Sequence, residues 1–325
     1  MNSEFEFINN IKSKYRLDKL GDDCAVLPKD GTTDLLLTAD LLIEDIDFRL
    51  EWTTPGLLGE KALAVSLSDI AAMCGEPKWA MLSIGVPENL WKTGFVDRFY
   101  EGWFRLAGQF KVELVGGDVS RSPDKLVIDS IVGGEAAKGK AVLRSTARPG
   151  DQIFVSGTLG GAAAGLKLVE QGHRFPPEVL ARGRCDDDNA VLNLTLHQLQ
   201  AAPALDLAKY LINNNIPTSA IDVSDGLSSD LQHICDASGV GARIDFDSLP
   251  INGLLSGLFP PDECEDMALN GGEDFLLLFT TRPNVTDIPG QFVTRIGEIT
   301  PDAGRVELVR SSGTEVLVPR GYRHF

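Results

Sequence analysis

Apolar positions in the first half of the chain alternate between the spacing of buried strands and the spacing of helices. Near-continuous apolar runs over residues 34–40, 79–86, 111–115 and 125–132 predict strands. Residues 56–74 have apolar positions at helical spacing and predict a helix that ends before Gly75 and Pro77. A second helix is expected over 90–110, with these residues on its buried side: Trp91, Phe95, Phe99, Trp103 and Leu106.

The second half opens with a predicted strand at 152–156, a glycine turn at 157–161 and a helix at 162–169. Two helices are expected to separate the first three of the later strands, which are predicted at 219–223, 242–246, 275–280, 292–296 and 305–309. Between the halves, residues 138–151 are polar and contain Arg148-Pro149-Gly150, which predicts a domain boundary. The expected domains are residues 1–140 and 141–325.

Composition restricts the class of protein. The chain has 325 residues, of which 43% are hydrophobic and 24% charged, as in ordinary soluble globular proteins. With 47 acidic and 30 basic residues, the net charge is −17, which opposes binding to nucleic-acid backbones and anionic lipid. No apolar stretch reaches the roughly 18–20 residues of a membrane span, and the first residues show no signal peptide. We therefore expect neither nucleic acid nor membrane as a partner.

The five cysteines, at positions 24, 74, 185, 235 and 264, are odd in number and lack CxxC spacing. This pattern favours free thiols in the cytoplasm over a disulfide framework or a zinc site. The charge run Arg182–Asn189 indicates a solvated loop or the entry to a helix.

Acidic residues recur at predicted strand ends and beside glycines. They form six groups: Asp22-Asp23, Asp40, Asp69, Asp118, Asp222 with Asp225, and Glu273-Asp274. A single aspartate beside glycine is most often a turn former. Six such groups favour a different interpretation, because carboxylates gathered without cations would repel one another. Several Mg²⁺ ions bridging a nucleotide would relieve that repulsion, so the pattern indicates phosphoryl transfer.

Motifs of other enzyme classes are weaker or missing in the sequence. There is no GxxxxGK[ST] phosphate loop, and the glycine turn at 157–162 does not match GxGxxG. The four histidines form no HExxH motif, and Ser156-Gly157 does not belong to a GxSxG elbow. Dinucleotide binding and triad hydrolysis are therefore disfavoured.

Seven motifs in order resemble those of the thiamine-monophosphate kinases. That family belongs to the superfamily of aminoimidazole-ribotide synthetase, selenophosphate synthetase and a hydrogenase maturation factor. The similarity runs from about Phe5 to Phe325 and rests on GDDCAV (21–26), TADLLIE (38–44), KALAVSLSDIAAM (61–73), GGD (116–118), IDVSDGL (221–227), GGEDF (271–275) and GYRHF (321–325).

The resemblance implies a two-domain, PurM-like fold of α/β and α+β character. The N-terminal domain, residues 1–140, would bind ATP and metal, and its sheet would pair with that of a second subunit to form a barrel. The C-terminal domain, residues 141–325, would be α+β with a ferredoxin-like core. The expected assembly is a cytoplasmic homodimer.

The resemblance also implies an activity: the γ-phosphoryl group of ATP passes directly, in line, to thiamine monophosphate, with Mg²⁺ required. The implied metal-binding residues are Asp23, Thr38, Ala39, Asp40, Asp69, Asp118, Asp222 and Asp225, with Asp40, Asp118 and Asp225 the most critical. ATP would contact Tyr100, Gly117, Asp118, Arg144 and Ser224. The thiamine end would contact Asp47, Glu273 and Tyr322.

Two positions depart from the family pattern. Position 47, usually a histidine on the substrate side, is an aspartate, and residues 197–204 lack the arginine that many members have there. Asp47 could reach the acceptor through a metal or water, or be a solvated turn residue. Two further functions stay open: an ATP-dependent synthetase or dehydratase with another acceptor, and a non-catalytic nucleotide-binding protein.

Overall fold

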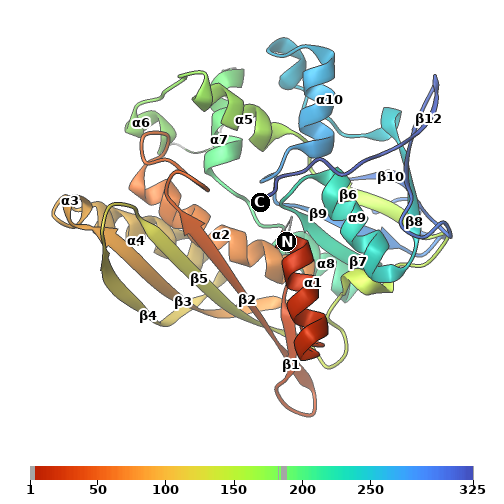
Figure 1. Cartoon of the computed structure of the whole chain (residues 1–325), viewed down its shortest axis with the longest axis horizontal. Helices are drawn as coiled ribbons and strands as arrows, with labels where there is room; N and C mark the ends of the chain where they lie inside the picture. Colours follow the sequence, from red (N-terminus) through yellow and green to blue (C-terminus); the bar gives the residue numbers. More distant parts are fainter. Residues whose placement is uncertain (1–3, 182, 184–188, 325) are drawn as a thin grey trace.

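The structure is a computed structural model that describes residues 4–181, 183 and 189–324. Most of the charge run Arg182–Asn189, including Cys185, lies outside the described residues. The chain folds around two sheets, and helix α2 lies between them (Figure 1). In the described part, no helix has the length and apolarity needed to cross a bilayer.

The first sheet has five strands in the order β1-β2-β5-β3-β4. Strands β3 and β4 are parallel, and the other neighbours are antiparallel. The elements of this half are α1 (Glu4–Tyr15), β1 (Ala25–Pro28), β2 (Thr33–Ile43), α2 (Pro55–Ala72), β3 (Glu76–Pro87), α3 (Glu88–Trp91), α4 (Phe95–Phe110), β4 (Glu113–Ser122) and β5 (Val127–Ala137).

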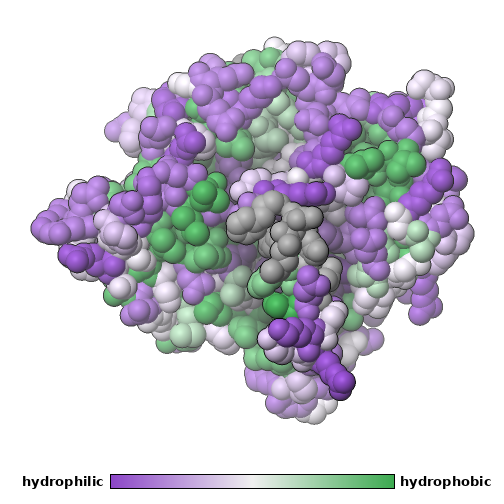
Figure 2. Space-filling model, in the orientation of Figure 1, coloured by the Kyte–Doolittle hydropathy of each residue, from purple (hydrophilic) through white to green (hydrophobic). Residues whose placement is uncertain are grey.

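The two faces of this sheet differ. Along β2, Leu36, Thr38 and Leu42 are buried on the face that α2 covers. The opposite face is open: Leu41 on β2 is 56% exposed and Met81 on β3 is 39% exposed. Figure 2 shows apolar surface over these strands. The sheet therefore leaves apolar area uncovered in the single chain.

The second sheet has seven strands in the order β12-β11-β8-β10-β6-β9-β7, with β8 and β11 parallel. It is wider than a four-stranded ferredoxin-like core. Its elements are η1 (Arg144–Thr146), β6 (Gln152–Ser156), α5 (Gly161–Glu170), α6 (Pro177–Leu180), α7 (Ala190–Leu199), α8 (Leu205–Asn213), β7 (Pro217–Val223), α9 (Leu227–Ser238), β8 (Gly241–Asp245), η2 (Phe246–Ser248), η3 (Leu255–Gly257), α10 (Pro261–Asn270), β9 (Leu276–Thr281), β10 (Val293–Thr300), β11 (Val306–Arg310) and β12 (Gly313–Val316).

Helix α2 joins the two halves. It packs on β2 and β5 of the first sheet and on β7 and β9 of the second. One hydrophobic cluster accordingly contains Leu36 from the first sheet together with Phe154 and Phe279 from the second. Because α2 is buried on nearly every side, polar residues along it must find partners within the protein.

Some sequence-based expectations were wrong. The single helix expected over 90–110 is two helices, α3 and α4, separated at Gly94, whose left-handed φ of 68° ends the helical path. Trp91 is 56% exposed rather than buried. Strands β2 and β4 also run further than expected, so Asp40 and Asp118 lie within strands and not at their ends.

The expectation of a two-domain α+β fold is confirmed. The first sheet ends at Ala137 and the second begins at Gln152. Neither sheet closes into a barrel within the described chain.

Candidate functional site

Three aspartates from separate parts of the chain meet where α2 contacts the second sheet. Asp23 precedes β1, Asp69 lies on α2, and Asp222 lies at the end of β7. One carboxylate oxygen from each lies within 4.8 Å of the others. Asp23 and Asp222 are buried, at 9% and 3% exposure. We call Asp23, Asp69 and Asp222 the acid cluster.

Hydroxyl groups hold the acid cluster and the adjacent Asp40. Ser68 on α2 donates to Asp222 Oδ2 at 2.6 Å, and Thr38 on β2 donates to Asp69. Ser66 donates to Asp40 Oδ2, also at 2.6 Å. Each hydroxyl fixes the orientation of one carboxylate but supplies no full positive charge.

The carboxylates are electrostatically under-compensated. Burial raises the pKa of Asp222 to about 7, with a further contribution from the charge of Asp23. Burial also raises the pKa of Asp40 to about 6, assisted by Asp129. For Asp69, burial and the charges of Asp40, Asp222 and Asp23 hold the pKa well above its usual range. This group of acids favours bound protons or bound cations.

Arg144 is the cation nearest to Asp23. Its guanidinium donates to both carboxylate oxygens, from Nη2 at 2.6 Å and from Nε at 3.2 Å. Its backbone N–H donates to Asp22, and its carbonyl accepts from Ser219 and Ser238. Arg144 is thereby fixed beside the acid cluster, with guanidinium N–H groups beyond the two used on Asp23.

A second group of possible ligands spans the turn after β7 and the beginning of α9. Asp225, Asp230 and His233 offer ligand atoms within 4.8 Å of one another. The buried Asp230 carboxylate accepts from the backbone N–H of Gly226 at 2.9 Å and of Asp225 at 3.2 Å. Tyr322 from the C-terminal tail donates its backbone N–H to the Asp225 carbonyl at 3.0 Å. The turn and the tail thus form one unit.

Glu273 lies next to this turn. Its backbone N–H donates to the Ser224 carbonyl at 2.8 Å, and its φ of 65° is unusual for a non-glycine residue. One carboxylate oxygen pairs with Lys61 Nζ at 2.6 Å, and the other accepts from the Gln198 amide. Glu273 thus has its charge balanced by a protein cation, as Asp23 does, whereas Asp69 and Asp222 accept hydrogen bonds from hydroxyl groups.

Asp47 occupies a turn that follows β2. Its carboxylate accepts the backbone N–H of Ile43 at 2.7 Å, and its own N–H donates to the Ile43 carbonyl at 2.9 Å. It lines a small cavity with Trp52, Lys61 and Gln198. The residue therefore has a turn-forming role and also faces the surroundings of Glu273.

Asp118 and Gly117 are not brought to Asp40 within one chain. The register aligns Asp40 with Ser130, Leu82 and Gly117 across four neighbouring strands. Three strand spacings of about 4.8 Å separate the ends of that row by about 14 Å. Asp118 is exposed on the edge strand β4. The two carboxylates cannot share an ion in the single chain.

Tyr100 also lies apart from the cluster, and the Ala39 side chain lies on the face of β2 opposite to Thr38, which contacts Asp69. Helix α4 carries Tyr100 and packs on α2 where the Phe99 backbone lies against Gly59, ten residues before Asp69. That separation is about 15 Å along the helix axis. Ala39 is exposed on β2, where β1 pairs only as far as Leu37. The edge of β2 beyond Leu37 has no partner among the described strands.

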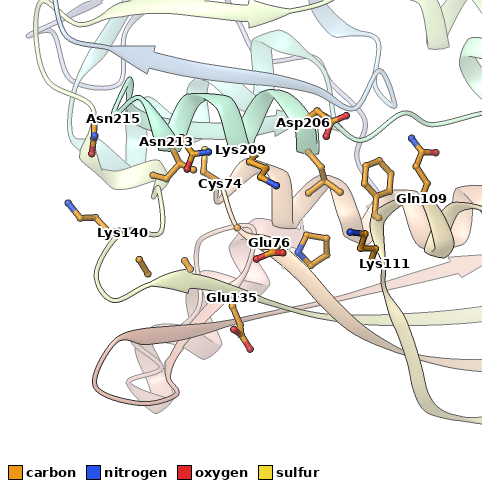
Figure 3. Close-up of a pocket in the computed structure, with 17 residues that line it drawn as sticks. Cys74, Glu76, Gln109, Lys111, Glu135, Lys140, Asp206, Lys209, Asn213 and Asn215 are labelled. Carbon is orange, nitrogen blue, oxygen red and sulfur yellow. The ribbon is translucent and has the colours of Figure 1, made fainter.

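A cavity of about 590 Å³ lies elsewhere, at the junction of β3, β5, α4 and α8 (Figure 3). Lys111, Lys140 and Lys209 project around it together with Glu76 and Asp206. It contains none of the residues expected to bind ATP, metal or acceptor. The five charged side chains named here are exposed, so the acid cluster is the better candidate for chemistry.

Sequence reasoning missed the residues that hold the expected ones: Lys61, Ser66, Ser68, Gln198 and Asp230. For the three on α2, a signal existed in polar residues on a helix that is otherwise apolar all round. Gln198 and Asp230 gave no such signal, because their partners come from distant parts of the chain or from the backbone.

Comparisons with known proteins identify the family of the chain. Residues 21–136 match the family profile described as "AIR synthase related protein, N-terminal domain", and residues 148–309 match the corresponding C-terminal domain. Thiamine-monophosphate kinase of Bacillus subtilis is 33% identical over 314 residues, covering 94% of this chain and 93% of the relative. The Escherichia coli K12 enzyme of that name is 34% identical over 341 residues, covering 99% and 98%.

Solved structures show the same fold. One described as "AaThiL complexed with AMPPCP and TMP" has a TM-score of 0.87 and 33% identity, covering 99% of this chain and 97% of that one. Hydrogenase maturation protein HypE in complex with ATP has a TM-score of 0.68 at 18% identity and shares the fold alone. Matches over nearly the whole chain, at this identity and with both domain profiles, place the chain in the thiamine-monophosphate kinase family of AIR synthase related proteins.

Proposed function

We propose that the chain transfers the γ-phosphoryl group of ATP to thiamine monophosphate, giving thiamine diphosphate and ADP. The observation that carries the proposal is the buried acid cluster, held by α2 beside the Glu273 turn. The family membership supports it, as does the similarity to a structure that contains AMPPCP and TMP.

The donor set of the acid cluster fits Mg²⁺. Its ligand atoms are carboxylate oxygens, which suit a hard cation, and the raised pKa values of Asp69 and Asp222 reflect negative charge that the protein leaves unbalanced. When bound, Mg²⁺ ions would supply charge neutralisation for the phosphates. The residues proposed to hold them are Asp23, Thr38, Ala39, Asp40, Asp69, Asp118, Asp222 and Asp225.

Other residues would bind and orient the two substrates. Arg144 would turn guanidinium donors toward the ATP phosphates, and Ser224, Gly117 and Tyr100 would complete the nucleotide site. Glu273, Tyr322 and Asp47 would hold the thiamine end. An oxygen of the acceptor phosphate attacks the γ-phosphorus in line, so a P–O bond forms to the acceptor as the bond to ADP breaks.

The proposal requires no phosphorylated enzyme, because the acceptor phosphate itself is the nucleophile. Protein incubated with γ-labelled ATP and Mg²⁺ without acceptor should retain no label. Stable label on the protein would contradict direct transfer.

We further propose a homodimer formed by the domain of residues 1–140. Its sheet has an open apolar face and two free edges: β4 on one side, and β2 beyond Leu37 on the other. Pairing with a second copy would cover the face and satisfy both edges. Such pairing brings β4 of one copy toward β2 of the other, so Asp118 would complete the metal site in trans.

The remaining assignments follow from these. Residues 141–325 would form the C-terminal domain that supplies Asp222, Ser224 and Glu273. The four described cysteines are free, which supports a cytoplasmic setting.

The decisive test is an assay with ATP, Mg²⁺ and thiamine monophosphate, in which ADP and thiamine diphosphate are measured together. Formation of both in equal amounts is expected. ADP formation without thiamine diphosphate would favour another acceptor, and nucleotide binding without turnover would favour a non-catalytic protein.

A further inference from the structure

Two of the polar side-chain contacts between helix α2 and the second half of the chain lie on one face of the helix. Ser68 contacts Asp222, and Lys61, seven residues earlier, contacts Glu273. Seven residues are two helical turns, or about 10 Å along the axis. One rigid helix therefore sets the spacing between the acid cluster and Glu273.

Lys61 and Gln198 hold the Glu273 carboxylate in a buried contact, and we call these two residues the clamp. The Lys61 side chain is only 5% exposed, and its ammonium donates to Glu273 Oε1 at 2.6 Å and to the Gln198 carbonyl at 3.4 Å. The Gln198 amide donates to the second oxygen of Glu273. Removing one partner of a buried ion pair has a far larger effect than removing one partner of a surface pair, because the other charge is left buried and unpaired.

The backbone of Glu273 is held as tightly as its side chain. Its N–H donates to the Ser224 carbonyl, and the next residue, Asp274, accepts the N–H groups of Gly160 and Ala162 at 2.6 and 2.9 Å. Non-glycine residues held at positive φ occur where the surrounding structure enforces them, and they gather at functional sites. The Glu273 side chain is still 30% exposed, so solvent or a ligand can reach part of it.

We propose that Lys61 is a positioning residue for the acceptor: together with Gln198 it fixes the Glu273 carboxylate, at a spacing set by α2, where thiamine monophosphate binds. The inference rests on the proposed function. Asp47 lines the same small cavity as Lys61 and Gln198, so the clamp lies between two of the residues assigned to the acceptor.

The test compares Lys61→Met with Lys167→Met. Lys167 also pairs with a glutamate, Glu263, at 2.5 Å, but both side chains are 37% exposed. In Lys61→Met the KM for thiamine monophosphate should rise at least tenfold while the KM for ATP stays within twofold. Calorimetry should show the same loss of affinity for thiamine monophosphate. Lys167→Met should leave all these constants within twofold.

A second variant tests the inference independently in case Lys61→Met does not fold. Gln198→Leu keeps the lysine and removes the other donor to Glu273, and it should raise the same KM about threefold. Equal shifts in both KM values, or a lower melting temperature with both KM values unchanged, would overturn the inference. Absence of turnover in the wild-type protein would instead count against the proposed function, because the clamp is judged by variant-to-wild-type ratios, including the calorimetric one.

Discussion

Helix α2 contacts the second half of the chain at two places, around Lys61 and around Asp69, and the buried charge is balanced differently at each. At the Lys61 end, Glu273 has both oxygens occupied by protein donors, one of them a buried cation. At the Asp69 end, several carboxylates share one cation, Arg144, and a few hydroxyl groups. The first end is complete in the isolated chain, whereas the second has an excess of negative charge.

This difference in charge balance indicates what each end can bind. A complete ion pair presents a fixed shape, which suits recognition of an organic acceptor. An incomplete acidic group presents unbalanced charge, which suits cations and the phosphates they accompany. Substitutions that remove a charge should therefore have their largest effects at the Asp69 end and smaller ones at the Lys61 end.

The largest expected effect is on Asp69. Asp69→Asn keeps the side-chain shape and removes one charge, so turnover should fall by roughly 100- to 1000-fold. The melting temperature of the metal-free protein should not fall, because the substitution relieves repulsion. Asp206→Asn, an exposed acid in the remote cavity, is the matched control and should retain full activity. Normal turnover in Asp69→Asn would refute the metal assignment.

Asp118 tests whether the acidic end is completed by a second copy. Asp118→Asn and Asp69→Asn homodimers should each be inactive. A heterodimer purified with two different tags has one site carrying both substitutions and one site carrying neither, if Asp118 acts in trans. It should recover roughly half of the wild-type turnover, since one of two symmetric sites is intact. A heterodimer as inactive as its parents would place Asp118 in its own chain's site.

Stability against pH reports the same unbalanced charge. The folded, metal-free protein holds protons on Asp40 and Asp222 up to about pH 6 and 7, whereas unfolded aspartates release them near pH 4. Stability should therefore fall as pH rises from 5 to 8, with a melting temperature lower by roughly 5 °C. Added Mg²⁺ should remove most of that slope. A flat profile without metal would show that the acids are balanced by other means.

The positions of some of these acidic residues could be predicted from the sequence. Asp222 was expected at a strand end and lies at the end of β7. The expectation was wrong for Asp40 and Asp118, because strand ends were inferred from where apolar runs stop, and both strands continue through polar residues. The pairing of Lys61 with Glu273 could not be inferred, since 212 positions separate residues 61 and 273 and only the packing of α2 between the sheets joins them.

The substitution with the smallest expected effect is at Asp47, near the Lys61 end of the helix. Its carboxylate accepts the Ile43 N–H, so Asp47→Ala should lower the free energy of unfolding by about 1 kcal/mol. As an acceptor residue it should also contribute weakly to binding, so the same variant should raise the KM for thiamine monophosphate about threefold and leave that for ATP unchanged. Asp47→Asn separates the two roles. Its side-chain oxygen can still accept the Ile43 N–H, so stability should return, while the missing charge should keep the KM raised. If Asp47→Asn restored both stability and KM, the residue would act only in the turn, and acceptor binding would depend on Glu273 and Tyr322.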